Sequence, residues 1–219
     1  MADLKPLFIV IDGIDGTGKT TQVRFLTEWL QKTGREAEST QEPGGTAAGA
    51  VIRSILVNKN MTLDPNAELL LFCADRVDHM QKINSKLNSG ISVVSDRFLP
   101  STWAYQIFGR KLQPGLLEAV ILHTVHIFPD LTIILDMDID TALARAGERL
   151  AKDEKTITEG RFESEKRDFF SDVQKGFRWY VTQERFGKSV IIDASGKTDE
   201  VAGKIQKACS EVICKHHMD

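Results

Sequence analysis

The chain has 219 residues, of which 42% are hydrophobic and 27% charged, and this ordinary globular composition predicts one domain over residues 1–219. Its net charge of −3 argues against a broad surface for nucleic acid or for anionic membranes. No apolar run approaches the ~20 residues that span a bilayer, and no basic and apolar leader precedes the first strand. We therefore expect a cytoplasmic protein with no nucleic-acid and no membrane partner.

The N-terminal segment predicts a strand, a tight turn and a helix. Residues 7–11 form an apolar, β-branched run, which indicates a strand buried on both faces of a parallel sheet. Gly13, Gly16 and Gly18 follow, and they allow successive N–H groups to point into one concavity. A helical pattern begins at Lys19 and places a helix N-terminus beside that concavity, which favours phosphate.

Residues 13–20 fit GxxxxGK[ST], the pattern of a nucleotide phosphate loop. In this pattern Lys19 contacts the β- and γ-phosphates, and the Thr20 hydroxyl contacts Mg²⁺. A plain strand-to-helix turn is the alternative, but such a turn needs neither of these side chains. We therefore expect ATP and Mg²⁺. The loop residues expected to bind the nucleotide are Gly13, Asp15, Gly16, Thr17, Gly18, Lys19, Thr20 and Thr21.

The rest of the chain alternates between strand and helix patterns. The further predicted strands are residues 36–40, 91–95, 131–135 and 190–192, and the clearest helices end near Val57 and cover residues 65–88. Five strands separated by helices predict an α/β fold with a parallel sheet and helices on both faces. Ligands bind such sheets at the carboxyl ends of strands, where the phosphate loop and Asp96-Arg97 both lie. A charged segment at about residues 147–165 predicts a mobile lid.

The phosphate loop alone is compatible with an ATPase, a GTPase or a small-molecule kinase. A GTPase should carry the guanine-binding pattern NKxD, and the nearest match, residues 58–61, lacks the aspartate. A motor or transporter ATPase would need partner domains that 219 residues can hardly hold. The remaining motifs must decide.

Seven segments, in order, resemble the thymidylate kinase family, particularly its bacterial type. They are FIVIDGIDGTGKTTQ (8–22), EPGGT (42–46), AELLLFCADR (67–76), VVSDRFLPSTWAYQ (93–106), LDMDIDTALAR (135–145), GRFESE (160–165) and IIDASG (191–196). The resemblance implies a P-loop nucleoside-monophosphate-kinase-like fold, a homodimer, and transfer of the γ-phosphoryl group of ATP to dTMP in dTTP biosynthesis. The alternatives are a related kinase for another pyrimidine nucleotide or a deoxynucleoside, and a non-enzymatic ATP-binding regulatory module.

Phosphoryl transfer needs in-line positioning and charge neutralisation, so cations should converge from several segments. The resemblance implies that Arg97, beside Asp96, holds the acceptor phosphate, and that Arg53 is a second candidate. Asp96 resembles the family's acid near Mg²⁺, with Thr20 as the other metal contact. By the same resemblance, Asp15 contacts the 3′-hydroxyl of the acceptor sugar. Surface ion pairs are the alternative for the two arginines, and a helix cap is the alternative for Asp96.

Phe72 and Arg76 lie four residues apart on one predicted helix, so they share a face. A ring beside a guanidinium can stack on a base and bond to its edge, which favours a pyrimidine. The resemblance implies that Phe72 stacks on thymine, that Arg76 reaches O4, and that Thr102 lies near N3. It also implies that Tyr105, followed by Gln106, excludes a ribose 2′-hydroxyl. Plain packing is the alternative for these aromatic and amide side chains.

The resemblance places the catalytic arginines in the lid, because Gly16 follows Asp15 where another class of the family carries arginine. The matching positions are Arg149 and Arg161, with Arg145 a weaker candidate. Solvated lid charges are the alternative. The predicted catalytic set is therefore Lys19, Arg97, Arg149, Arg161 and Asp15.

The chain departs from the family pattern at two positions. Gln41 stands where bacterial members commonly have arginine, and Gly160 stands where an aspartate commonly precedes the lid arginine.

Overall fold

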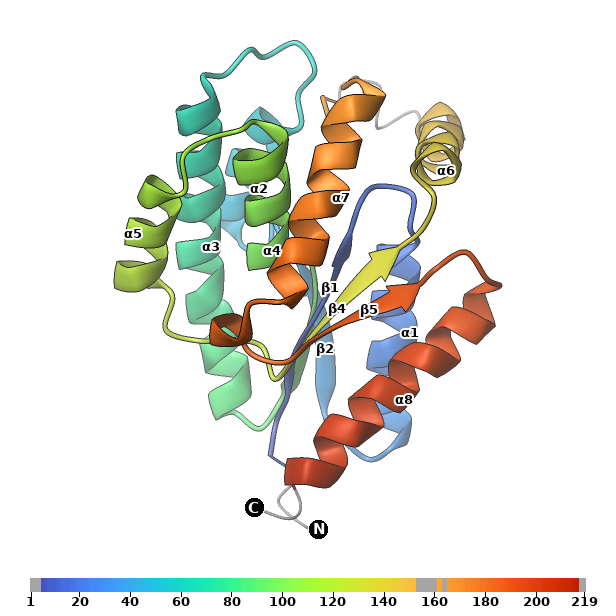
Figure 1. Ribbon diagram of the computed structural model, residues 1–219. Coiled ribbons are helices and arrows are strands. Elements are labelled where there is room, and N and C mark those ends of the chain that lie inside the picture. Colours follow the sequence, from blue (N-terminus) through green and yellow to red (C-terminus); the bar gives the residue numbers. More distant parts are fainter. Residues whose placement is uncertain (1–4, 153–160, 163–164, 217–219) are drawn as a thin grey trace.

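The computed structural model describes residues 5–152, 161–162 and 165–216. A five-stranded parallel sheet with the order β2-β3-β1-β4-β5 forms its centre (Figure 1). The strands are β1 (Phe8–Gly13), β2 (Ala37–Gln41), β3 (Ser92–Asp96), β4 (Leu131–Asp136) and β5 (Ser189–Asp193). The predicted α/β fold is confirmed, and the bounds of each strand lie within two residues of those expected.

Helices cover both faces of the sheet. They are α1 (Lys19–Lys32), α2 (Ala47–Leu56), α3 (Pro65–Asn88), α4 (Leu99–Thr102), α5 (Gly115–Thr124), α6 (Ile139–Lys152), α7 (Arg167–Val181) and α8 (Thr198–His216). Two short helices of other types accompany these α-helices: η1 (Trp103–Gly109) is a π-helix and η3 (Glu184–Phe186) is a 3₁₀-helix. Helices α1 and α8 cover one face, and α3, α4 and α7 cover the other (Figure 1).

The predicted lid at residues 147–165 is described only in part. Helix α6 continues to Lys152, and Arg161 and Phe162 are described, whereas residues 153–160 and 163–164, Gly160 among them, lie outside the described residues. In the described part of the chain, no helix is long and apolar enough to cross a bilayer.

The central strand β1 is buried along its whole length, as its apolar sequence predicted. Phe8 and Val10 join the core against α3, whereas Ile9 and Ile11 join the core against α1. Side chains alternate along a strand, so only an all-apolar segment can pack on two helical layers at once.

The sheet register brings two loops together at one edge. Ile11 on β1 is paired with Asp96 on β3, so the chain segments that follow both residues leave the sheet side by side. Gly13 then passes so close to β4 that a Cβ atom there would lie 2.4 Å from Leu135 O. Its φ of 144° is also one that residues with side chains rarely adopt. The strand order and this glycine therefore fix where the following loop starts.

Helix α3 is the longest helix, and its start is strongly specified. Asp64 accepts hydrogen bonds from the backbone N–H of Asn66, at 2.8 Å, and from that of Ala67. Pro65 occupies the first helical position, where its missing N–H costs nothing. The bounds of the predicted helix at residues 65–88 are confirmed.

Helix α7 packs closely on η1 because Gly176 has no side chain. A Cβ atom at Gly176 would lie 2.7 Å from Ala104 Cα and 2.9 Å from the ring of Phe108. We therefore expect Gly176→Ala to separate α7 from η1 and to lower the free energy of unfolding by about 1–3 kcal/mol. Urea denaturation followed by circular dichroism measures this change.

Gly203→Ala on α8 is the matched control, because no atom lies within 4 Å of a Cβ atom built there. Its better helix propensity should raise the free energy of unfolding by about 0.5–1 kcal/mol. Equal effects at the two positions would contradict the packing argument.

Candidate active site

The loop between β1 and α1 leaves a helix N-terminus open. Gly18 precedes α1 with φ 88°, and no side chain caps the first N–H groups of the helix. The side chain of Lys19 bends back over the loop, where its Nζ donates to Ile14 O at 2.8 Å and lies 3.7 Å from Asp15 Oδ1. Burial lowers the pKa of Lys19. A buried cation beside free helical N–H groups is a site for an anion.

A cavity of about 530 Å³ opens over this loop. The cations that line it come from the loop, from α2, from the end of β3 and from α6, and they are Lys19, Arg53, Arg97, Arg145 and Arg149. Three acidic residues, Asp15, Glu42 and Asp96, line it as well. The predicted convergence of cations from separate segments is therefore present in the structure.

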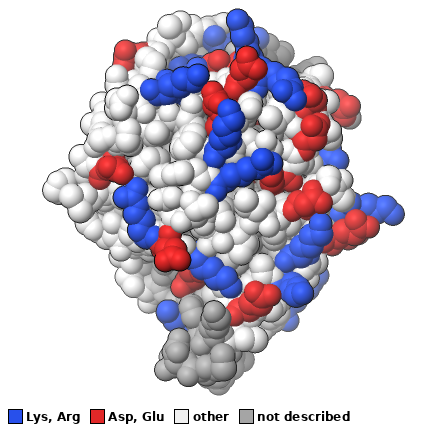
Figure 2. Space-filling model, viewed as in Figure 1, with Lys and Arg blue, Asp and Glu red and all other residues white. Residues whose placement is uncertain are grey.

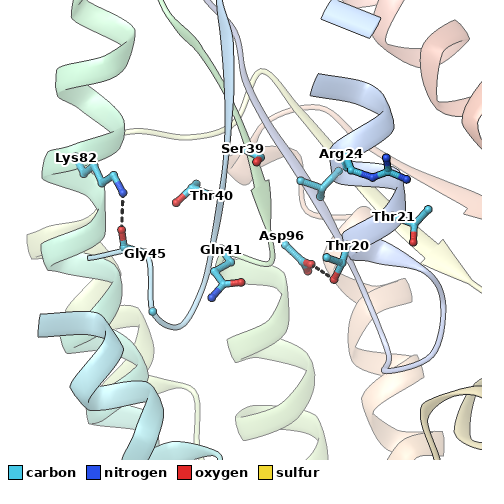
Figure 3. A pocket seen from close by; sticks show the side chains of 11 residues that line it. Thr20, Thr21, Arg24, Ser39, Thr40, Gln41, Gly45, Lys82 and Asp96 are labelled. Atoms are coloured by element: carbon cyan, nitrogen blue, oxygen red, sulfur yellow. Dashed lines mark hydrogen bonds between the residues drawn. The ribbon is translucent and has the colours of Figure 1, made fainter. Parts of the chain in front are cut away.

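Thr20 and Asp96 bring two oxygen atoms together at the floor of this cavity. The Thr20 hydroxyl donates to Asp96 Oδ2 at 2.6 Å, a bond that joins the first turn of α1 to the end of β3 (Figure 3). Within the described ranges, no group of three or more His, Cys, Asp or Glu side chains could hold a metal ion. This pair suits Mg²⁺, which prefers oxygen ligands and completes its shell with phosphate oxygens and water.

A second cavity of about 510 Å³ adjoins the first and shares Thr20, Thr21, Gln41 and Asp96 with it (Figure 3). Gln41 thus lies between the two cavities, at the position where bacterial members of the family commonly have arginine. Lys82 lies on the far side, where its Nζ donates to Gly45 O at 2.7 Å.

Arg97 is held in one orientation at the edge of the main cavity. Its backbone has φ 72°, a left-handed conformation that is costly for a residue with a side chain, and Ser95 Oγ donates to its carbonyl oxygen at 2.7 Å. Its guanidinium donates to Asp15 Oδ1 at 2.6 Å and to Ser101 Oγ at 2.9 Å. Strain of this kind is found where the surroundings impose a functional position.

Asp12 is a site residue that the sequence analysis missed. Its fully buried carboxylate accepts from the Gly13 N–H at 2.8 Å and from the N–H and hydroxyl of Ser101, at 2.9 and 2.7 Å. Its Oδ1 also lies 3.4 Å from Arg97 Nη1, and burial raises the pKa of its carboxyl group. The available signal was an acidic residue next to the last position of a buried strand.

Asp15 connects Arg97 to Tyr105. The Tyr105 hydroxyl donates to Asp15 Oδ2 at 3.0 Å, and the Arg97 guanidinium lies 5.3 Å from the centre of the Tyr105 ring. Burial acts to raise the pKa of Asp15, but the positive charges of Arg97 and Lys19 outweigh it and hold this pKa well below its usual range. Asp15 is therefore ionised in the folded protein.

Arg76 is buried on α3 and has protein partners already. Its Nε donates to Glu42 Oε2 at 2.9 Å, and its Nη2 donates to Phe98 O at 3.0 Å. His79, one turn further, contacts Glu42 Oε1 through Nδ1 at 3.0 Å. Glu42 and His79 were not predicted as site residues, and they hold the loop after β2 against α3.

Phe72 and Tyr105 both pack against the ring of Phe162, a residue of the predicted lid. The ring of Phe162 lies 6.2 Å from that of Phe72 and 5.5 Å, edge to face, from that of Tyr105. Thr102 lies nearby on α4, and its buried hydroxyl has no hydrogen-bond partner among the described residues. Gln106 Nε2 donates to Glu68 Oε1 at 2.8 Å.

Of the four other predicted arginines, three line the main cavity and one does not; Arg145 is among the three. Arg53 lines the main cavity, and its Nη1 donates to Pro43 O at 3.2 Å. Arg149, on α6, lines the same cavity. Arg161 does not line it: its Nη2 donates to Glu68 Oε2 at 2.6 Å, on the α3 side of the molecule.

The family model described as thymidylate kinase matches residues 11–205. The chain belongs to the thymidylate kinase family. The resemblance inferred from the sequence is thereby confirmed.

Relatives within the thymidylate kinase family match over nearly the whole chain. A thymidylate kinase of Oleidesulfovibrio alaskensis is 39% identical over 212 residues, which cover 94% of this chain and 99% of that protein. A thymidylate kinase of Neisseria gonorrhoeae is 38% identical over 209 residues, 93% of this chain and 96% of that one. The crystal structure of a thymidylate kinase from Ehrlichia chaffeensis superimposes with a TM-score of 0.73 at 28% identity, and covers 93% of this chain and 98% of that chain.

The charge of Asp15 predicts a pH dependence of stability. The pKa of Asp15 is lower in the folded protein than its ordinary value of 3.8, so its ion pairs stabilise the fold above that value and are lost as the pH falls below it. We expect Asp15→Asn to be less stable than the wild type at pH 7, and the difference to shrink between pH 5 and pH 2. Thermal unfolding across this pH range measures it.

Glu148→Gln, at an exposed position on α6, is the control and should follow the wild type at every pH. A stability difference for Asp15→Asn that stays constant with pH would show that Asp15 has an ordinary pKa.

Proposed function

We propose that this member of the thymidylate kinase family transfers the γ-phosphoryl group of ATP to dTMP and produces dTDP and ADP. The observation that supports this most strongly is the set of cations gathered over the phosphate loop, from four separate segments, beside the Thr20–Asp96 pair. Transfer between two phosphate groups requires that many negative charges be neutralised in one place.

The donor side of the site is formed by the loop and α1. The free N–H groups at the start of α1 and the Lys19 ammonium would bind the β- and γ-phosphates of ATP. Thr20 and Asp96 would hold Mg²⁺, which, when bound, neutralises charge on the donor phosphates. Arg149, on the rim of the same cavity, would approach the transferring group from the side of α6.

The side for the acceptor phosphate would be formed by Arg97, after β3, and by Arg53, on α2. Arg97, fixed by Asp15 and Ser101, would hold the phosphate of dTMP in line with the donor. Arg53 would add a second positive charge. The acceptor phosphate has a second pKa near about 6, so it is largely ionised at neutral pH and needs no strong general base.

The base and sugar contacts rest on α3 and η1. Phe72 would stack on the thymine ring, with Arg76 at O4 and Thr102 near N3. The unpartnered, buried hydroxyl of Thr102 supports a ligand contact there. Tyr105, fixed by Asp15, would occupy the space that a ribose 2′-hydroxyl needs, and Asp15 would contact the 3′-hydroxyl.

Arg161 is the lid arginine with the less favourable position for catalysis. Its bond to the buried Glu68 would have to break before it could reach the transferring phosphoryl group. Of the two lid arginines, we therefore assign the contact with the transferring phosphoryl group to Arg149.

We also propose a homodimer and a cytoplasmic location. Val51 on α2 and Leu70 on α3 are 63% and 47% exposed, and a second copy could cover both because these helices pack side by side (Figure 1). Cys73, Cys209 and Cys214 are all free thiols, as expected in a reducing compartment. Light scattering at several concentrations tests the dimer.

A coupled assay of ADP release with Mg·ATP tests the reaction. The acceptors to compare are dTMP, dUMP, UMP, dCMP, dGMP, AMP and thymidine. We expect the highest kcat/KM for dTMP. Turnover of thymidine or of another monophosphate in preference would contradict the acceptor assignment, and the absence of any turnover would favour a regulatory ATP-binding module.

Arg97→Ala separates acceptor binding from donor binding. We expect KM for dTMP to rise at least about tenfold, because a charged hydrogen bond to a phosphate contributes about 1.5–3 kcal/mol. KM for ATP should change little. Lys175→Ala, at an exposed position on α7, is the control, and an unchanged KM for dTMP in Arg97→Ala would disprove the assignment.

Tyr105→Ala tests the exclusion of ribose. We expect kcat/KM for ribothymidine monophosphate to rise relative to that for dTMP, because the removed ring leaves room for the 2′-hydroxyl. Tyr105→Phe, which keeps the ring and loses only the bond to Asp15, should retain the wild-type preference. The hypothesis fails if the ratio is the same in all three proteins.

A further inference from the structure

Glu68 is a fully buried carboxylate near the proposed base site that the reaction described above does not use. Three side chains bond to it, two from η1 and the residue that follows it and one from the predicted lid. Gln106 Nε2 on η1 donates to its Oε1 at 2.8 Å, Arg161 Nη2 donates to its Oε2 at 2.6 Å, and Arg110 Nε lies 3.4 Å from Oε1. A buried charge persists only when it is paired and hydrogen-bonded, and the two guanidinium groups meet that need.

The charge of Glu68 fixes the orientation of the Gln106 amide. An ionised carboxylate only accepts hydrogen bonds, whereas an amide has a donating and an accepting end. If the amide were rotated by half a turn, Gln106 Oε1 would face Glu68 Oε1 with no proton between two oxygen atoms. Nε2 must therefore face Glu68, and Oε1 points the other way.

The fixed amide bonds to the helix that carries the proposed base residues. Glu68, Phe72 and Arg76 follow one another at intervals of four residues, so they lie along one face of α3. Gln106, on the facing η1, contacts the first of the three. A pyrimidine stacked on Phe72 would thus lie between a donor, the Arg76 guanidinium, and an acceptor, Gln106 Oε1.

This pair of groups matches one class of pyrimidine. Thymine and uracil present an accepting O4 next to a donating N3–H, whereas cytosine presents a donating N4 amino group next to an accepting N3. The hydroxyl of Thr102 can donate or accept, so it cannot distinguish the two classes. Gln106 Oε1 can, because it only accepts.

We propose that Glu68 is a positioning residue that makes the site selective for 4-oxo pyrimidines, by holding the Gln106 amide with its oxygen toward the base. The proposal rests on the proposed function, since it presumes a pyrimidine on Phe72. Arg110 and Arg161 serve it indirectly, because they keep the carboxylate charged and in place.

Glu68→Gln tests this proposal with a side chain of the same shape. Its amide can donate to Gln106 Oε1, so the Gln106 amide is free to rotate and to present its NH₂ group to the base. We expect the ratio of kcat/KM for dTMP to that for dCMP to fall by about tenfold or more, the effect of one exchanged hydrogen bond. The ratio for dTMP to dUMP should stay within about twofold, because both bases carry O4 and N3–H.

Two control variants separate selectivity from stability. Glu68→Asp keeps the charge and should keep the dTMP to dCMP ratio even if the protein loses stability. Arg110→Gln removes a guanidinium from Glu68 but leaves the carboxylate facing Gln106, and it should also keep the ratio. In combination with Gln106→Leu, Glu68→Gln should have no further effect on the ratio, since the group through which it acts is gone.

The outcomes are distinct. If Glu68→Gln slows the reaction equally with dTMP, dUMP and dCMP, Glu68 only stabilises the fold and the proposal is wrong. If Glu68→Gln does not fold, Gln106→Leu decides, because an unchanged dTMP to dCMP ratio in that variant would overturn the proposal. A wild-type protein that phosphorylates none of the three would contradict the proposed function itself.

Discussion

The buried carboxylate of Asp12 is the contact on which the site depends most. It joins the end of β1 to the segment after β3, because it accepts from Gly13 on one side and from Ser101 on the other. Arg97, the first residue after β3, bonds to Ser101 in its own segment and to Asp15 in the loop after β1. The loop after β1 and Arg97 are thus held by one buried carboxylate, so neither can move independently of the other.

Helix α3 provides the second support of the site, through polar side chains on the face toward the loop after β2. Asp75 accepts from the Gly44 N–H at 2.9 Å, His79 and Arg76 bond to Glu42, and Thr46 bonds to Asp78. Glu42, Arg76 and His79 are buried, so removal of one of them would leave a buried polar group unsatisfied, which costs more than a hydrogen bond contributes. The proposed base residues and the polar side chains that hold the loop after β2 therefore lie on one helix.

The sequence was sufficient for the parts of this structure that local patterns specify. The β-branched run of β1, Pro65 at the start of α3 and the glycines of the phosphate loop each act through their own backbone or through near neighbours, so their effects can be predicted without the fold. Asp12, Glu42 and Glu68 could not be found in this way. Their side-chain partners lie 34 to 93 residues away in the chain, and a carboxylate alone does not indicate which distant donors will surround it. Arg161 illustrates the same limit, because its arginine signal was clear but its partner was not.

The π-helix η1 has a consequence for how this chain can change in evolution. A π-turn holds one residue more than an α-turn, so loss of a single residue from Trp103–Gly109 would convert it to regular α-helix. All side chains beyond the deletion would then rotate by ~100° about the helix axis. Gln106 and Arg110 would leave Glu68 together in one genetic step, whereas a substitution changes one of them at a time. Variation in length at this segment should therefore alter the choice of substrate more abruptly than variation in its sequence.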